Sequence, residues 1–325
     1  MDERHERIAA ENTAAESRYY AGGYKGPAPL IPPEQLYVDK NNSIIPILFS
    51  KWTVYAYLSF LVTGDQGSGK TTYLKSIARF YPPSAALRVS ELQPEINLRF
   101  AYPNRNILAF AETGSVSVQD GLDFQKKTSG TVNIIGEIAT ARAASWYVQT
   151  CKVASKSGAG THHAKTVPDL ITAYAMNMMS VDGYNNEKSV EVMVADAIDV
   201  DIHMTRDRGD RFCERITEIN AIKLEDYPFT HIENFVAPDH KGELTFEQAA
   251  LVNEMEYYKR ITDRSTFKYQ NLCHFDRKTK TYVFDNMFTD DTIRRILSNI
   301  PADEEKDFVR DMNAILKVAG KGKLI

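Results

Sequence analysis

The chain has 325 residues and a formal net charge of −4. Its 43% of apolar and 25% of charged residues are ordinary for a soluble protein, and the slightly acidic balance argues against a basic surface for nucleic acid or membrane lipid. The three cysteines, Cys151, Cys213 and Cys273, have neither the spacing of a metal site nor that of a disulfide framework, which favours a reducing compartment.

No apolar targeting segment is visible near the start of the chain. Residues 1–7 are mostly charged, so we expect no signal peptide, and the longest apolar run, 52–63, is too short to span a bilayer. Residues 1–43 are polar and then rich in glycine and proline, which predicts a mobile arm and linker before the core. We therefore expect a cytoplasmic protein, for which any association with a membrane would come through a partner.

A glycine-rich stretch follows the apolar run. Residues 58–63 predict a short buried strand, and a helix is expected from Thr71 to about Phe80. Between them lies the pattern G-x-x-x-x-G-K-[ST] of a phosphate-binding P-loop, in which backbone N–H groups and a helix N-terminus face the phosphates. The predicted nucleotide-binding residues are Gly64, Asp65, Gln66, Gly67, Ser68, Gly69, Lys70, Thr71 and Thr72.

Two residues of this loop have specific expected roles. Lys70 is expected to reach the β- and γ-phosphates, and Thr71 is expected to bind Mg²⁺ through its hydroxyl. A chance glycine-rich turn is the alternative. The strand before the loop and the helix after it favour the P-loop.

Strand-like and helix-like segments alternate after the P-loop. This order predicts an α/β fold with a largely parallel core sheet over residues 44–222. The expected strands are 86–91, 106–112, 131–137 and 215–222, the expected helices are 116–127, 141–156 and 167–179, and 190–204 should pass from helix to strand. The glycine-rich residues 157–161 are expected to end the predicted helix 141–156 and to form a loop.

The character of the chain changes beyond residue 223. Residues 246–260, 290–297 and 303–318 are charged and helix-like, and 279–284 is an expected strand. We therefore expect a small, mostly helical C-terminal appendage over residues 223–325, without chemistry of its own.

Three acidic residues follow expected strands. Glu137 comes at the end of an apolar strand, where P-loop enzymes place an acid that holds metal-bound water or polarises the attacking water. Glu91 and Glu95 lie at another strand end, and either position water or Mg²⁺ or belong to an ordinary charged loop.

Histidines and arginines supply further candidates. His162 and His163 point to opposite sides if their segment is extended, so at most one of them faces the site, and no zinc ligands are near in the sequence. Residues 206–211 are read as a solvated hairpin. A set of scattered arginines is available to act across a subunit interface. They are Arg88, Arg99, Arg105 and Arg142.

Taken in order, these segments resemble one family. Residues 62–72, 87–91, 95–99, 134–137 and 160–164 look like the Walker A, Asp-box, Walker B and His-box series of the secretion ATPases, which drive type II and type IV secretion, pilus assembly and conjugation. The similarity covers roughly residues 44–222. The Flp-pilus and conjugation subgroup is the most similar, because the cysteine-rich insertion of many type II members has no counterpart here.

The resemblance implies a RecA-like core that hydrolyses ATP with Mg²⁺ in a hexameric homo-oligomer. In its terms Glu91 and Glu95 are the Asp-box acids, Glu137 is the Walker B glutamate that holds Mg²⁺ through water, and His163 is the His-box histidine. The family implies a partner protein in an inner-membrane platform, which would hold the protein at the inner face of the cell membrane. Direct binding of nucleic acid is not expected, because the chain is slightly acidic.

The sequence also departs from the family pattern. Leu92 follows Glu91 where the family usually has an acid, Ala139 replaces a frequent arginine, and Thr131 lies near the place of a frequent acid. Only about forty linker-like residues precede the core, where the family has a folded domain. An alternative to the motor is therefore a non-catalytic, nucleotide-binding assembly subunit. A P-loop ATPase that handles DNA is a third hypothesis, against which the acidic chain argues.

Overall fold

The computed structural model describes residues 44–322 except 92–93, 112–117, 126, 223–246, 249, 252–253 and 256–264. The predicted arm over residues 1–43 and most of the predicted helix over 246–260 therefore lie outside the described residues.

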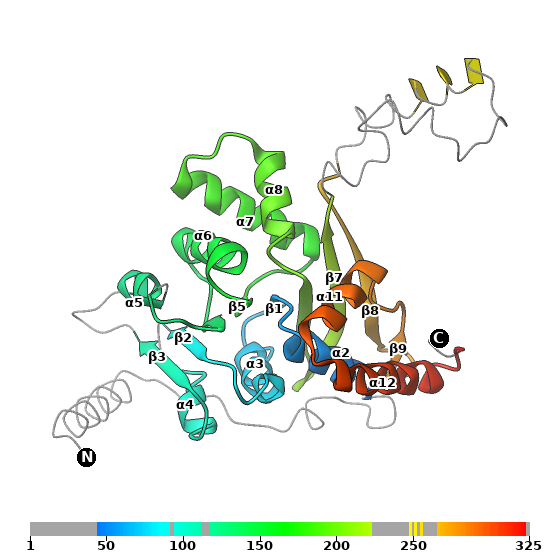
Figure 1. Cartoon of the computed structure of the whole chain (residues 1–325), viewed down its shortest axis with the longest axis horizontal. Helices are drawn as coiled ribbons and strands as arrows, with labels where there is room; N and C mark the ends of the chain where they lie inside the picture. Colours follow the sequence, from blue (N-terminus) through cyan, green and yellow to red (C-terminus); the bar gives the residue numbers. More distant parts are fainter. Residues whose placement is uncertain are drawn as a thin grey trace.

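A mixed sheet forms the centre of the molecule (Figure 1). In the described part of the chain it has nine strands in the order β3-β2-β4-β5-β1-β6-β7-β8-β9. The six from β3 to β6 in this order are parallel, and β7, β8 and β9 are added antiparallel. The strands are β1 (Phe60–Gly64), β2 (Leu87–Glu91), β3 (Ile107–Ala111), β4 (Val132–Ile135), β5 (Ser157–His162), β6 (Val200–Asp207), β7 (Asp210–Ala221), β8 (Phe267–Asp276) and β9 (Thr281–Phe284). The predicted α/β fold with a largely parallel sheet is confirmed.

Helices cover both faces of the sheet (Figure 1). On one face, α2 (Ile44–Tyr55), α3 (Lys70–Ile77), α11 (Asp290–Asn299) and α12 (Glu305–Val318) bury apolar side chains in one core cluster. On the other face, α6 (Ala141–Gln149), α7 (Val167–Asp182) and α8 (Glu187–Ala195) form the second cluster. The short α4 (Leu98–Ala101) and α5 (Val118–Gln125) flank β2 and β3. This three-layer arrangement explains why the central strands are apolar on both sides.

The helix that follows the P-loop and the helix that starts after Thr166 form as predicted. Helix α3 continues as a 3-10 turn over Ala78–Phe80. Thr166 is the N-cap of α7, and its hydroxyl accepts a hydrogen bond from the backbone N–H of Asp169 at 3.2 Å. A capped N-terminus with a proline in the first turn is the local signal that fixes where α7 begins.

Strand β5 corrects the sequence analysis, which expected a break at residues 157–161. The helix before it ends as a single π-helical turn over Thr150–Ala154, and β5 then lies between β1 and β4. Glycine is needed here for close packing: a Cβ on Gly158 would lie 2.2 Å from Cys151 Sγ, and one on Gly160 would lie 2.8 Å from Ile138 Cδ1. A strand whose glycines make room for neighbouring segments has the same local sequence as a glycine-rich loop, so the local sequence alone predicted a loop here.

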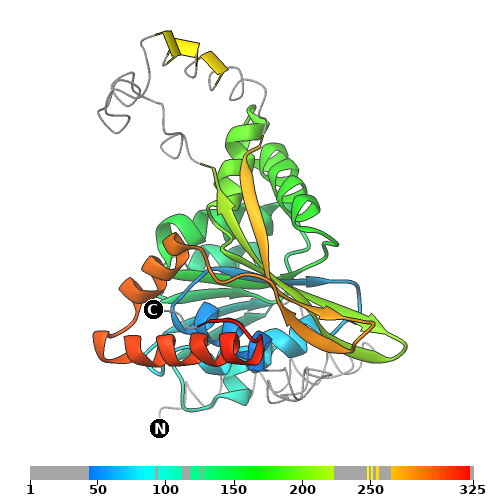
Figure 2. The same cartoon turned by 90° about the vertical axis from the view of Figure 1, so that its right-hand side faces the viewer.

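Strand β8 was also missed by the sequence analysis. It pairs with β7 over most of its length, and these two long strands extend the sheet beyond its parallel part (Figure 2). The predicted strand at 279–284 is present as β9, and the two predicted helices are present as α11 and α12.

Helix α12 packs on α2, although the two helices are far apart in the sequence. The rings of Trp52 and Phe308 meet edge to face at 5.2 Å, and buried Asp311 accepts hydrogen bonds from Lys51 Nζ at 2.6 Å and from Trp52 Nε1 at 3.2 Å. The described C-terminal elements thus share a core with the P-loop part of the chain, while the domain boundaries remain a prediction. None of the helices in the described ranges has the length and apolar composition that crossing a bilayer requires.

Candidate functional site

The P-loop connects β1 to α3 as the motif predicts. Gly64, Gly67 and Gly69 all have positive φ angles, of 133°, 74° and 94°, which only glycine adopts without strain. A Cβ on Gly64 would also lie 2.0 Å from the carbonyl oxygen of Met204. Gly69 is the N-cap of α3 and supplies no side-chain acceptor to its first turn, so the N–H groups of that turn are available to an anion.

Lys70 is buried against the loop that precedes it. Its Nζ donates hydrogen bonds to the carbonyl oxygens of Gly64 at 3.0 Å and Asp65 at 2.9 Å, and it lies 3.3 Å from Nδ1 of His163. Burial lowers the pKa of Lys70, and the nearby carboxylate of Glu137 acts in the opposite direction. The ammonium group is therefore placed at the centre of the predicted phosphate site.

Glu137 and His163 meet beside the P-loop. Because β4, β5 and β1 are parallel neighbours, the residues that follow them emerge at the same edge of the sheet. The Nε2 of His163 lies 3.2 Å from Oε1 of Glu137, and its Nδ1 lies 3.2 Å from the carbonyl oxygen of Gly64. Both side chains remain about half exposed, at 47% and 48%, so water reaches this pair.

His162 faces away from the site, as the alternation of an extended segment predicts. Its Nδ1 lies 2.7 Å from the carbonyl oxygen of Ile138, and its ring packs edge to face on Tyr174 at 4.9 Å. Burial lowers the pKa of His162. Of the two adjacent histidines, His163 is the one that contacts the P-loop.

The two Asp-box candidates have different surroundings. Glu91 is buried and accepts hydrogen bonds from the backbone N–H groups of Ile96 at 2.6 Å and Asn97 at 3.3 Å. Burial raises the pKa of its carboxyl to about 7, although the two backbone donors favour the ionised form. Glu95 is exposed, and its Oε2 lies 3.4 Å from the hydroxyl of Thr71. Glu95 is thus the acid that reaches the P-loop, while Glu91 is bonded to the backbone of Ile96 and Asn97.

A contact that the sequence analysis missed joins the hairpin of β6 and β7 to the P-loop. Arg211 Nε donates a hydrogen bond of 2.7 Å to the carbonyl oxygen of Gly67, and its Cδ would lie 3.3 Å from a Cβ on Gly69. Arg206 Nη1 lies 3.8 Å from where a Cβ on Gly67 would stand. The predicted solvated hairpin over residues 206–211 is present, and it contacts the P-loop in addition. No local pattern reveals this contact, because it requires knowing that β6 lies next to β1.

The four scattered arginines separate into two pairs. Arg88 donates to the backbone carbonyls of Leu87 and Thr128, and Arg105 donates to those of Arg79 and Tyr81. These two guanidinium groups are tied to the fold of their own chain. Arg99 and Arg142 are exposed.

The residues of the loop fit a nucleotide phosphate with its metal ion. The hydroxyl oxygen of Ser68 is fully buried and has no hydrogen-bond partner in the described structure. Within the described ranges, no three of the histidine, cysteine and carboxylate groups are grouped to hold a metal by themselves. A bound Mg²⁺ would accordingly be held by Thr71 together with phosphate oxygens and water, the arrangement that is known from P-loop proteins.

The fold is similar to those of several secretion and pilus ATPases. The Brucella suis type IV secretion ATPase VirB11, solved with sulphate, matches with a TM-score of 0.48 and 20% identity over 57% of this chain and 56% of its own. The Legionella pneumophila ATPase DotB matches with a TM-score of 0.45 and 13% identity, over 70% of this chain and 67% of its own. The pilus retraction motor PilT, solved with bound ADP, matches with a TM-score of 0.47 and 14% identity, over 86% of this chain and 70% of its own.

The matched region spans just over half the length of VirB11. No protein-family model and no curated protein matches the sequence. Identities of this size describe a similar fold and say nothing about which residues act.

Proposed function

We propose that this protein binds ATP with Mg²⁺ and hydrolyses it. One observation carries the proposal: Lys70 and His163, from separate segments, both contact the carbonyl of Gly64, and Glu137 from a third segment contacts the other ring nitrogen of His163. A structural turn would need none of these ionisable groups. A site that binds phosphates and activates water needs a cation, a carboxylate and free backbone N–H groups within a few ångströms of each other.

Each group has a role in this proposal. The P-loop N–H groups, Lys70 and Thr71 hold the phosphates and Mg²⁺, with Asp65, Gln66, Ser68 and Thr72 completing the loop. Bound MgATP supplies an activated phosphoryl group that water attacks. Glu137 orients that water and accepts its proton. The exposure of the Glu137 side chain, 48%, leaves it open to solvent for this purpose.

The order of motifs along the chain supports a motor of a secretion, pilus-assembly or conjugation machine. We further propose a hexameric ring that works on a partner protein in an inner-membrane platform, on the cytoplasmic side. In such a ring a neighbouring subunit can supply an arginine to the γ-phosphate, and Arg99 and Arg142 are the exposed candidates among the four arginines named above. Direct binding to nucleic acid is not part of the proposal, since the chain is acidic.

One observation favours a second function, that of a nucleotide-binding assembly subunit without turnover. Both oxygens of the Glu91 carboxylate accept hydrogen bonds from backbone amides, so this acid is engaged away from the P-loop. In this case nucleotide binding would order the assembly, and no phosphate would be released.

The test is ATP hydrolysis measured against protein concentration, with the oligomer followed by light scattering and ADP binding measured in parallel. Wild type is compared with Lys70→Ala and with Lys306→Ala, which removes an exposed lysine from α12. We expect turnover that rises with assembly and is lost in Lys70→Ala alone. Tight ADP binding with no turnover at any concentration would favour the assembly subunit. Full turnover in Lys70→Ala would show that the site is elsewhere.

A further inference from the structure

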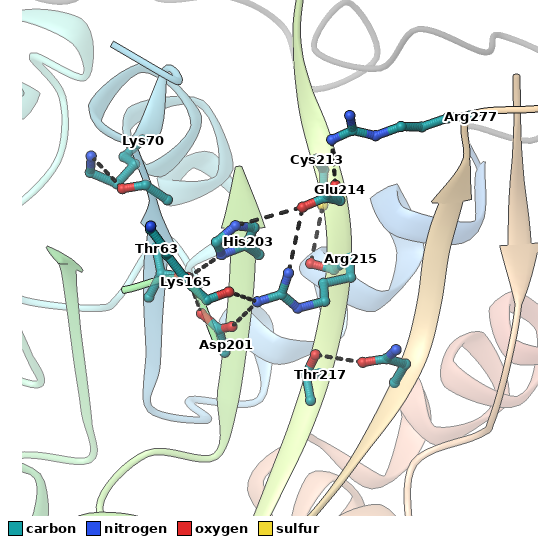
Figure 3. A network of polar contacts seen from close by, with 12 residues as sticks. Thr63, Lys70, Lys165, Asp201, His203, Cys213, Glu214, Arg215, Thr217 and Arg277 are labelled. Atoms are coloured by element: carbon teal, nitrogen blue, oxygen red, sulfur yellow. Dashed lines mark hydrogen bonds and ion pairs between the residues drawn. The ribbon is translucent and has the colours of Figure 1, made fainter. Parts of the chain in front are cut away.

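Arg215 on β7 lies in a polar network behind the candidate site (Figure 3). Its Nη2 donates a hydrogen bond of 2.7 Å to the carbonyl oxygen of Lys165 and lies 3.8 Å from Oδ2 of Asp201. Its Nη1 lies 3.5 Å from Oε2 of Glu214. One guanidinium group therefore contacts two other chain segments and its own neighbour on β7, and its planar fork of donors is suited to such multiple contacts.

The Lys165 carbonyl belongs to the segment that carries His163. This segment leaves β5 at His162 and enters α7 after Thr166, the N-cap of that helix. Between these two fixed points, the bond from Arg215 is what holds the backbone beside Lys165. His163 is two residues away, so the position of its ring over Gly64 depends on where this carbonyl is held.

The other side of the network reaches the P-loop strand. Asp201 is buried, and its Oδ1 accepts a hydrogen bond of 2.5 Å from the hydroxyl of Thr63, the residue directly before Gly64. Because that hydroxyl proton is used for Asp201, the ring of His203 donates from Nδ1 to Thr63 at 2.9 Å. Burial lowers the pKa of His203 to about 3, so the ring is neutral. Arg215 thus pairs with a buried carboxylate that is hydrogen-bonded to the residue before the P-loop.

We propose that Arg215 is a positioning residue of the nucleotide site, which sets the His163 segment against the P-loop strand through Lys165 and Asp201. The inference rests on the proposed ATPase activity for its kinetic consequence. Arg215 touches neither Glu137 nor Lys70, and it acts only by fixing the backbone that presents His163. Groups that orient a functional side chain in this way commonly change activity by about 10- to 100-fold when they are removed.

The first measurement is hydrogen exchange of the backbone over residues 162–166 in the nucleotide-free protein. Arg215→Gln should speed exchange in this segment, whereas Arg277→Gln should not. Arg277→Gln is a matched control, because it removes the same positive charge from the same network. Arg277 pairs with Glu214 at 2.6 Å and has no contact with Lys165 or Asp201 among the described ion pairs and hydrogen bonds. Equal exchange in wild type and Arg215→Gln would overturn the inference.

The second measurement separates positioning from general damage. In Arg215→Gln we expect kcat for ATP to fall about tenfold with KM nearly unchanged, and no further fall when Arg215→Gln is added to His163→Ala. Additive losses in that pair would overturn the inference. Should wild type show no turnover while Arg215→Gln still speeds exchange at 162–166, the ATPase proposal fails and the positioning of the segment stands.

A further variant guards against misfolding. Arg215→Gln leaves Asp201 buried without its cation, which by itself destabilises a fold. Asp201→Asn combined with Arg215→Met removes both charges, keeps an oxygen for Thr63 and still removes the donor to Lys165. If this folded double variant has normal exchange at 162–166, Arg215 does not position the segment.

Discussion

The imidazole of His163 bridges Glu137 and the backbone of Gly64, with Nε2 3.2 Å from Oε1 and Nδ1 3.2 Å from the carbonyl oxygen. A neutral ring has one N–H and donates to only one of these two acceptors. When Nε2 donates to Glu137, Nδ1 is free to accept from Lys70, which lies 3.3 Å away. In that tautomer His163 links Glu137 and Lys70 in one chain of contacts beside Gly64.

The first prediction concerns Glu137. Glu137→Gln keeps the size of the side chain but removes the proton acceptor, so ATP turnover should fall by about a hundredfold or more, while nucleotide affinity changes little. Steady-state phosphate release and ADP binding measure the two effects. Glu305→Gln, which neutralises an exposed acid on α12, should leave both unchanged. Equal turnover in wild type and Glu137→Gln would remove Glu137 from the mechanism.

The second prediction concerns the hairpin of β6 and β7. Arg211→Gln loses the hydrogen bond of 2.7 Å from β7 to the carbonyl oxygen of Gly67, and this bond ties the P-loop to the hairpin. Because the arginine is exposed, we expect the loss to cost about 1 kcal/mol, or roughly a fivefold weaker binding of ADP. Binding titrations at two salt concentrations measure it.

Arg208→Gln is the control for this second prediction. Arg208 lies at the tip of the same hairpin, is exposed, and carries the same charge. If both variants weaken ADP binding equally, the effect is one of net charge, and the contact with Gly67 has no special importance.

Local signals in the sequence were sufficient for much of the fold. The P-loop is defined by a short motif with fixed spacing, and the start of α7 is defined by its N-cap residue Thr166. Both were therefore predicted where they occur. Strand β5 was not, since Gly158 and Gly160 serve close packing with segments that are distant in sequence. Strand β8 was missed for a related reason, because its pairing with β7 determines it more than its own alternation does.

The candidate site divides in the same way. Lys70 was predicted from the P-loop motif and Glu137 from the end of an apolar strand, whereas His163 was predicted only from the resemblance, since the strand β5 that precedes it was not expected. The contacts of Arg211 and Arg215 depend on the order of the strands, which no local pattern supplies. The buried state of Glu91 is likewise set by Ile96 and Asn97 closing over it, and not by the strand that carries it.

The third prediction is a pH dependence of stability that arises from Glu91. Its pKa is raised from 4.5 to about 7 in the folded protein, so the folded state binds this proton more tightly than the unfolded state does. The resulting stabilisation is fully present below about pH 4.5 and is lost as the pH rises through about 7, and it amounts to something on the order of 3 kcal/mol. Glu91→Gln should lack this dependence.

Thermal unfolding of wild type and Glu91→Gln between pH 5 and pH 8 measures the third prediction. The Tm of wild type should fall relative to that of the variant as the pH rises. Asp201, whose pKa burial raises to about 6, titrates in the same interval, but it is present in both proteins and cancels in the difference. A difference in Tm that stays constant with pH would contradict a protonated, buried Glu91.

The fourth prediction tests the packing that turns residues 157–162 into a central strand. In Gly158→Ala the new Cβ would lie 2.2 Å from Cys151 Sγ and 3.0 Å from Tyr147 Cε2. Such overpacking typically costs about 1–3 kcal/mol, and the free energy of unfolding from urea titration should fall by that amount. Cys151→Ala removes the nearer clash, so the double variant should regain part of the loss, and only part because the contact with Tyr147 persists. Gly322→Ala, with nothing within 4 Å, should stay within about 0.5 kcal/mol of wild type. If Cys151→Ala gives no recovery, the π-helical turn does not pack on β5 as described, and the position of His163 at the end of that strand would need another explanation.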